Sequence, residues 1–372
     1  MDAIKYACLT VVLVFTIIQL LVVYAADNDS DSSSRDYTKY EEMVDIPGGE
    51  FTMGTDARNA KDGEGPTHDE KVKPFKISKY PVTNYAFREF VRAKKYKTDA
   101  EKYEWSFVFD DFVPEEIKNE IPERIQGAPY WIPVKRAYWR QPEGKGSGIE
   151  SRMHYPAVHI SFQDAKAYCQ WKGWRLPTEK EWEFAARGGL KGKTYPWGDK
   201  WQKNRLNLWQ GKFPKKNTKH DGYHGLAPVD AYPPQNEYGL HDMVGNTWEW
   251  TSTRFETAQT SPADDPNSTY VLRGGSYIDS KDGKFNHQLR VSTRMSNTAD
   301  AGSDNLGFRC AQSVGTKKTG KLPEDTRSKP SKPEVKEIKE GETVKQKRPN
   351  PADLRGKKKP TSNKKKEAKS EL

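Results

Sequence analysis

The sequence predicts a single α+β domain over residues 42–313, rich in irregular backbone and preceded by a linker at residues 27–41. Three observations support this fold class. The chain has 28 Gly and 24 Pro among 372 residues, and its apolar stretches in this region are short. All 11 Trp lie between Trp105 and Trp250, so the material for an aromatic core belongs to the middle of the chain. Few segments have helical periodicity, and no internal repeat is evident.

Three helices are expected in the body. Residues 83–94 carry apolar side chains at helical spacing behind a threonine, a residue type preferred at helix starts. Residues 161–171 have the same arrangement behind a serine, and Cys169 lies on the apolar side. A third, shorter helix should begin after Thr178, because Thr178 and Glu181 have the spacing of a capping box. Short strands are expected elsewhere, separated by turns at residues 47–49, 188–189 and 273–275.

Residues 1–26 have the organisation of a secretory signal peptide. Lys5 precedes an apolar run over residues 7–23, which small residues follow. The alternative is an uncleaved signal anchor, because the run is long enough to span a bilayer. Both interpretations place the body in a luminal or extracellular compartment. For the processed chain we expect no stable membrane insertion.

Residues 314–372 form a basic tail that we expect to be disordered. The tail holds 19 of the 62 Lys and Arg but only 9 of the 52 Asp and Glu, so it accounts for the whole net charge of +10. It contains no Phe, Trp or Tyr and cannot bury enough apolar area to offset an ordering cost of about 1–2 kcal/mol per residue. A solvated spacer and a tether for an acidic surface are both open. Because the body is neutral, nucleic-acid binding is not expected.

The last four residues, 369–372, read Lys-Ser-Glu-Leu and resemble the retrieval signal Lys-Asp-Glu-Leu. Together with the signal peptide they predict residence in the lumen of the endoplasmic reticulum, with partial secretion as the alternative if the retrieval signal is weak. A signal peptide also argues against a nuclear address in the Lys runs. The lumen adds N-glycans, and acceptor sequons begin at Asn28 and Asn267.

Cys169 and Cys310 are the cysteines that remain once the signal peptide, which contains Cys8, is removed. In an oxidising lumen we expect them to bond to each other. In the chain-entropy model, closing a loop of this length stabilises the fold by about 5 kcal/mol. A reactive redox pair is the alternative, although an apolar helix face is a poor place for a reactive thiol.

Seven short motifs, rich in Gly, Trp and Arg, follow one another along the body. They are residues 43–54 (MVDIPGGEFTMG), 81–84 (PVTN), 175–183 (RLPTEKEWE), 196–198 (PWG), 244–250 (VGNTWEW), 273–277 (RGGSY) and 305–310 (NLGFRC). In their order and identity the motifs resemble those of the sulfatase-modifying factor family. The resemblance implies one domain distantly related to C-type lectins, held together by calcium, in which Cys169 and Cys310 form a structural disulfide.

The resemblance also bears on catalysis. The active member of the family, the formylglycine-generating enzyme, uses oxygen and a copper ion held by two cysteines to oxidise a Cys within a Cys-x-Pro-x-Arg segment of newly made sulfatases. The matching stretch here, residues 277–290, contains no Cys. Asp279 stands at the first position and Asn286 near the second. Oxygen ligands do not replace the soft thiolates that suit Cu(I), so we expect no copper, no catalytic residues and kinship with an inactive branch.

Two structural calcium sites are further implied by the resemblance. Carboxylate, amide and backbone carbonyl oxygens are the ligands that calcium takes in proteins, usually six to eight of them. A site fully coordinated by fixed protein oxygens leaves little room for a substrate, so its role would be structural. The implied ligands are Asn207, Leu208, Asp221 and Tyr223 for the first site, and Asp242, Gly245, Thr247 and Glu249 for the second.

The expected function is therefore that of a non-catalytic luminal protein that binds newly made sulfatases, the active enzyme or both, and modulates sulfatase activation. The family also makes a homodimer plausible. Trp248 and Ser276 would line what remains of the peptide groove. One alternative is an oxidase with an altered metal site built from Asp279, Asp282 and His287. Another is a carbohydrate- or protein-binding module, which rests on fold analogy.

Overall fold

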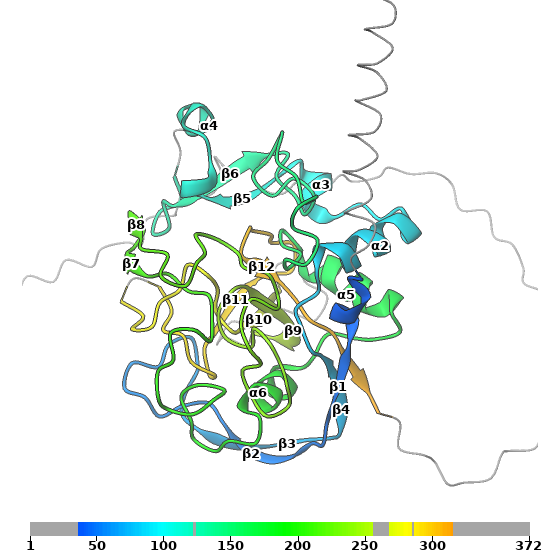
Figure 1. The fold of residues 1–372 in the computed structure, drawn as a ribbon, viewed down its shortest axis with the longest axis vertical. Helices are drawn as coiled ribbons and strands as arrows, with labels where there is room; N and C mark the ends of the chain where they lie inside the picture. Colours follow the sequence, from blue (N-terminus) through cyan, green and yellow to red (C-terminus); the bar gives the residue numbers. More distant parts are fainter. Residues whose placement is uncertain (1–35, 122–123, 256–267, 285, 315–372) are drawn as a thin grey trace, which may run out of the picture.

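The computed structural model describes residues 36–121, 124–255, 268–284 and 286–314 (Figure 1). Within these ranges, short helices and short strands are joined by long irregular stretches, which confirms the α+β class. No helix of the described part is long and apolar enough to cross a membrane. The predictions that fall outside it are the signal peptide (1–26), the sequons at Asn28 and Asn267, and the tail beyond Val314.

The predicted helix starts are confirmed. The Thr83 side chain accepts a hydrogen bond from the N–H of Ala86, and reciprocal capping boxes open the next two predicted helices, one of them between Thr178 and Glu181. Each cap satisfies backbone donors that the first turn leaves unpaired. The helices are α2 (Asn84–Lys94), α3 (Asp99–Tyr103), α4 (Glu115–Glu120), α5 (Phe162–Trp171) and α6 (Glu179–Arg187), with 3-10 turns η1 (Thr38–Glu41) and η2 (Asp110–Phe112).

A four-stranded sheet in the order β11-β10-β9-β12 forms the centre of the domain (Figure 1). Its strands are β9 (Trp248–Arg254), β10 (Thr269–Arg273), β11 (Arg294–Thr298) and β12 (Leu306–Gly307). Strand β12 runs parallel to β9, and the other pairs are antiparallel. The register places Arg273 between Glu249 and Arg294, so charged residues of three neighbouring strands meet at one end of the sheet.

Smaller sheets surround the central one. A three-stranded sheet has the order β1-β4-β13, and three two-stranded hairpins pair β2 with β3, β5 with β6, and β7 with β8. Figure 1 shows β2 and β3 passing beneath α6. The strands are β1 (Met43–Ile46), β2 (Gly49–Met53), β3 (His68–Val72), β4 (Phe75–Ser78), β5 (Trp105–Phe109), β6 (Trp131–Lys135), β7 (Gly211–Lys212), β8 (Lys216–Asn217) and β13 (Ala311–Ser313).

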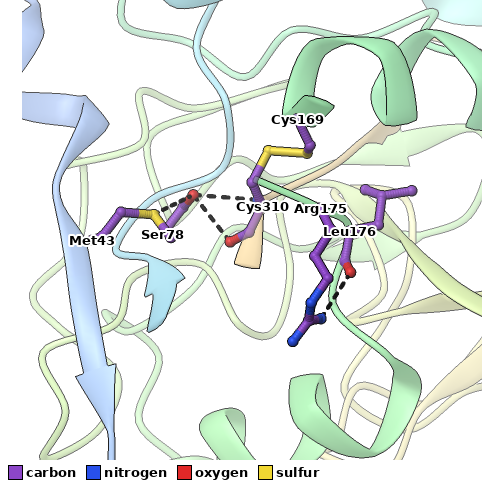
Figure 2. The surroundings of a disulfide bond; sticks show 6 residues. All are labelled: Met43, Ser78, Cys169, Arg175, Leu176 and Cys310. Atoms are coloured by element: carbon purple, nitrogen blue, oxygen red, sulfur yellow. Dashed lines mark hydrogen bonds between the residues drawn. A yellow bond between two sulfur atoms is a disulfide. The ribbon is translucent and has the colours of Figure 1, made fainter. Parts of the chain in front are cut away.

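The main core lies where α2 and α5 pack together against the central sheet. Phe87 and Phe90 of α2 contact Tyr168 of α5, and all three rings are buried. Cys169 of α5 is bonded to Cys310, with 5.7 Å between their Cα atoms, which confirms the predicted pairing (Figure 2). Both half-cystines are fully buried, so this bond is structural.

Buried polar side chains satisfy much of the irregular backbone. Arg309 donates to the carbonyls of Ser78 and His241, and the Gln235 side chain bonds both the N–H and the C=O of Val244. Buried backbone groups need such partners when no helix or sheet supplies them. Hydrogen bonds from buried side chains therefore hold the loops in place together with the disulfide.

Candidate functional site

Asp279, at the first lost cysteine position, is built into a tight turn. Its side chain is 2% exposed. One carboxylate oxygen, Oδ2, accepts hydrogen bonds from the backbone N–H of Ser276 at 2.8 Å and from the Ser276 hydroxyl at 3.0 Å. The other, Oδ1, accepts from the backbone N–H of His287 at 3.1 Å. The carboxylate thus joins Ser276 to His287, near the two ends of residues 277–290. This stretch, which matches the cysteine-bearing segment of the active enzyme, is called the former active stretch.

Asn286, near the second lost position, is also engaged in local bonds. Its Nδ2 donates to the carbonyl of Ile278 at 2.6 Å, and its Oδ1 accepts from the Tyr130 hydroxyl at 3.1 Å. The amide therefore links this stretch to the segment that leads into β6. Neither Asp279 nor Asn286 is a thiol, so these two side chains do not supply the soft thiolate pair that suits Cu(I).

His287 lies between two carboxylates. Its Nδ1 is 3.3 Å from Asp279 Oδ1 and its Nε2 is 3.1 Å from Asp62 Oδ2, while the Trp248 ring meets the imidazole edge to face at 4.9 Å between centroids. Burial alone would lower the pKa of His287, but the hydrogen bonds to Asp279 and Asp62 outweigh it and raise the pKa to about 9. The hydrogen bond from His287 in turn lowers the pKa of Asp62. His287 is therefore an imidazolium at neutral pH.

The alternative metal site is not assembled in the structure. Asp282 accepts hydrogen bonds from the Ser280 hydroxyl and from the N–H of Lys284 within its own turn. In the described part of the chain, no three His, Cys, Asp or Glu side chains come together in a way that could hold a metal ion. The prediction that Asp279, Asp282 and His287 form one metal site is therefore wrong, because Asp282 is hydrogen-bonded within its own turn instead of facing the other two.

Trp248 and Ser276 lie below the surface rather than along an open groove. They are 3% and 0% exposed. The Ser276 hydroxyl donates to Asp279 and accepts from Asn305 Nδ2 at 2.9 Å, so its proton is held by an internal partner. The prediction that these two side chains line a groove needs correction, because packing makes them the floor under the former active stretch.

A cavity of about 380 Å³ lies nearby, between α6, β3 and the end of the central sheet. Its charged walls largely neutralise each other: Arg273 donates to Glu179 and Glu183, and Arg294 donates to both oxygens of Glu179. Sequence reasoning missed this cavity, because its walls come from six separate segments. The lining residues are Met53, Gly54, Gly63, Glu64, His68, Glu70, Thr178, Glu179, Lys180, Glu183, Thr253, Arg273 and Arg294.

The four residues of the first predicted calcium set are adjacent, and they offer oxygen atoms of the kind that calcium takes in proteins. Asn207 Nδ2 donates to the carbonyl of Gly225 and to Asn246 Oδ1, which leaves the Asn207 amide oxygen as an acceptor. The Asp221 carboxylate accepts from the N–H groups of Leu208 and Tyr223 at 3.3 and 3.2 Å, so all four predicted residues are adjacent. Burial raises the pKa of Asp221. A nearby cation would offset that burial, as oxygen ligands for calcium require.

The second set fits in part. Asp242 is buried, accepts from Asn246 Nδ2 at 2.8 Å, and burial raises its pKa to about 7. Among the residues that the structure describes, the buried Thr247 hydroxyl has no hydrogen-bond partner. These oxygens suit a cation. The Glu249 carboxylate already has a buried cation as its partner: Arg309 donates to each oxygen at 2.7 Å, and Trp182 Nε1 donates to Oε2 at 2.7 Å, so its charge is paired within the fold.

Asp304, below the former active stretch, gives the domain a predictable pH dependence. Its carboxyl accepts from the Tyr277 hydroxyl at 2.9 Å and from the N–H of Phe109 at 2.8 Å. Burial raises the pKa of Asp304 to about 7 from an ordinary value of 3.8. Because the folded state holds this proton more tightly, the contribution of Asp304 to stability is present below pH 3.8 and is lost as pH rises through about 7.

Urea denaturation between pH 4 and pH 8 measures this dependence. We expect the free energy of unfolding of the parent chain, relative to Asp304→Asn, to fall up to about pH 7 and to level off above it. Asp45→Asn, at an exposed position, should show no such slope. Parallel pH profiles for the parent and Asp304→Asn would contradict this expectation, because they would show that the pKa of Asp304 is the same in the folded and the unfolded chain.

Comparisons with known proteins agree with the motifs and the fold. A family model described as the sulfatase-modifying factor enzyme 1-like domain matches residues 28–314. The chain is 58% identical over 273 residues to the Bos taurus protein named inactive C-alpha-formylglycine-generating enzyme 2, covering 73% of this chain and 88% of that one. It is 46% identical over 279 residues to the formylglycine-generating enzyme of Mus musculus, covering 72% and 74%.

A solved structure supports the fold by itself. PvdO from Pseudomonas aeruginosa matches with a TM-score of 0.51 and 24% sequence identity, covering 73% of this chain and 94% of that chain. At this identity the likeness concerns architecture. The family-model match over residues 28–314 and the two relatives establish that the chain belongs to the sulfatase-modifying factor family.

Proposed function

We propose that this chain is a non-catalytic member of its family that binds newly made sulfatases, the active formylglycine-generating enzyme or both, and so modulates sulfatase activation. The observation that carries the proposal is the replacement of the two cysteine positions by Asp279 and Asn286. Both side chains have fixed internal partners. The name of the Bos taurus relative, which includes the word inactive, supports the same reading.

Peptide binding without chemistry is consistent with the site. The former active stretch lies over the buried Trp248 and Ser276, and Tyr130 reaches it from the segment before β6. Because both side chains are buried, a bound peptide would contact the surface of this stretch rather than Trp248 or Ser276, and backbone hydrogen bonds would hold it. The place of action would be the lumen of the endoplasmic reticulum, where the signal peptide and the Lys-Ser-Glu-Leu end would keep the chain.

A mass-spectrometric assay tests both parts of the proposal. The full processed chain is incubated with a synthetic Cys-x-Pro-x-Arg peptide, oxygen and Cu(I), and peptide retention and peptide mass are read from one sample. We expect retention without the mass loss of thiol-to-aldehyde conversion, while the active enzyme in a parallel tube converts the peptide. Conversion by this chain would overturn the non-catalytic reading, and absence of retention would overturn peptide binding.

Calcium is proposed as a structural ion of the first site, with a second ion held by Asp242, Thr247 and the carbonyl of Gly245. When bound, it supplies charge that offsets the buried carboxylates. A ligand at 100 times its Kd stabilises a fold by about 2.7 kcal/mol, so we expect calcium to raise the melting temperature and a chelator to lower it. Asp221→Asn should remove much of this response, whereas Asp199→Asn, at a surface ion pair with Lys193, should keep it.

A further inference from the structure

Residues 54–66, which lie between β2 and β3, are called the strap. Hydrogen bonds join the strap to residues 287–294. Asn59 Nδ2 donates to Gln288 Oε1 at 2.7 Å, and Arg290 Nε donates to Glu64 Oε2 at 2.6 Å. Arg294 Nη1 donates to the carbonyls of Asp62 and Gly63 at 2.9 and 3.2 Å, and Arg290 also reaches Asn59. The strap thus lies along residues 287–294, which begin within the former active stretch and continue beyond its end.

His287 extends this line of contacts to the first lost position. One ring nitrogen faces Asp62 on the strap and the other faces Asp279. The imidazole is therefore a bridge between two segments that are 217 residues apart in the chain, measured from Asp62 to Asp279. Its backbone N–H also donates to Asp279, so the ring is held from two sides.

The charges in this cluster favour the protonated ring. Asp279 is almost fully buried, and in the described part of the chain the ion-pair partner of its carboxylate is His287 rather than any Lys or Arg. A buried carboxylate without a cation is strongly disfavoured. The groups that face the imidazole are Asp279 from its own loop, Asp62 from the strap and the neutral Trp248 ring from β9.

We propose that His287 is a built-in cation that bridges Asp279 to Asp62 and thereby locks the strap over the former active centre. In this chain the centre lacks its cysteines, and an ion-paired side chain ties it to the strap. The lock neutralises Asp279, and it uses both nitrogens with which a histidine would bind a metal ion. The inference rests on the proposed non-catalytic function for the reading of Asp279, but not on the binding of any sulfatase.

Hydrogen exchange measured by mass spectrometry on the full processed chain tests the lock. In His287→Asn we expect exchange at residues 55–66 and 279–290 to become about tenfold faster at neutral pH, because hydrogen bonds to charged groups stabilise by this order. Exchange in α5 should stay unchanged. Asp62→Asn, at a half-exposed position, should loosen the strap while keeping the Asp279–His287 pair, and it serves if His287→Asn fails to fold.

The matched control for Asp62→Asn is Asp45→Asn. The Asp45 side chain is 77% exposed and pairs with Lys76 on the surface, so its loss should not change the exchange of the strap. Unchanged strap protection in both His287→Asn and Asp62→Asn would overturn the lock. Because this readout contains no peptide, failure of the lock and failure of sulfatase binding are told apart.

Further measurements on the parent chain, including NMR of the His287 ring, test the lock independently of these variants. The ring resonances of His287 should titrate well above the ordinary histidine pKa of about 6.5, and after correction for intrinsic rates, strap protection in the parent chain should decline as pH rises through about 9. Titration of His287 near an ordinary value would contradict the proposal. So would selective broadening of its ring resonances by added Mn(II), since that result would make His287 a free metal ligand.

Discussion

Replacing Cys169 and Cys310 together by alanine is expected to lower the free energy of unfolding by about 5 kcal/mol. The bond joins residues 141 apart in the sequence, and in the chain-entropy model a loop of that size restricts the unfolded chain by this amount. For a domain of this size each kcal/mol corresponds to about 2–4 °C, so the melting temperature should fall by about 10–20 °C. Figure 2 shows the bond linking α5 to the segment before β13.

Thermal and urea denaturation of the double alanine variant measure the effect. Alanine is the right replacement because serine would leave hydroxyl groups in a fully buried place. Treating the parent chain with a reductant should reproduce the loss without altering any side-chain volume. A double variant as stable as the parent would mean that packing alone holds α5 to the segment before β13.

Glu249→Gln is expected to destabilise the domain by about 3–5 kcal/mol, since it removes one partner of a buried ion pair. Glu249 and Arg309 are both fully buried and meet through two hydrogen bonds of 2.7 Å. The change leaves the Arg309 guanidinium buried opposite a neutral amide. The same carboxylate also accepts from Trp182, so the variant disturbs the contact between α6 and the central sheet.

Urea denaturation measures the loss, with Glu50→Gln as the control. Glu50 pairs with Lys71 on the surface with a side chain 74% exposed, so its replacement should change stability by less than about 1 kcal/mol. Calcium titration of Glu249→Gln separates two roles of this residue. A retained calcium response with low stability supports the ion pair, and a lost response with normal stability would restore Glu249 as a calcium ligand.

Several features could be predicted because their signals are local or exclusive. Thr83, Ser161 and Thr178 start helices through caps that lie within three residues in the sequence. The disulfide followed from there being one pair of cysteines outside the signal peptide. Helices α3 and α4 were not predicted, because five or six residues are too few for a periodic pattern.

For the candidate site, the sequence predicted which residues are present but not which side chains contact each other. The missing cysteines can be read directly from residues 277–290, whereas the partners of the residues in their place cannot. Asp62 was not singled out by the sequence, since an Asp before a Gly in a polar loop reads as an ordinary turn. Its contact with His287, 225 residues away, exists because the β2–β3 connection folds back over the former active stretch.

The sequence by itself determined the family, the helix starts, the disulfide and the loss of the cysteine pair, because each depends on which residues are present or on short spacings. The tertiary structure alone decided that Glu249 binds Arg309, that His287 joins Asp62 to Asp279, and that Trp248 and Ser276 are buried. The physical reason is that a carboxylate is stabilised equally well by calcium, arginine or imidazolium, and only the folded chain brings one of these cations within reach.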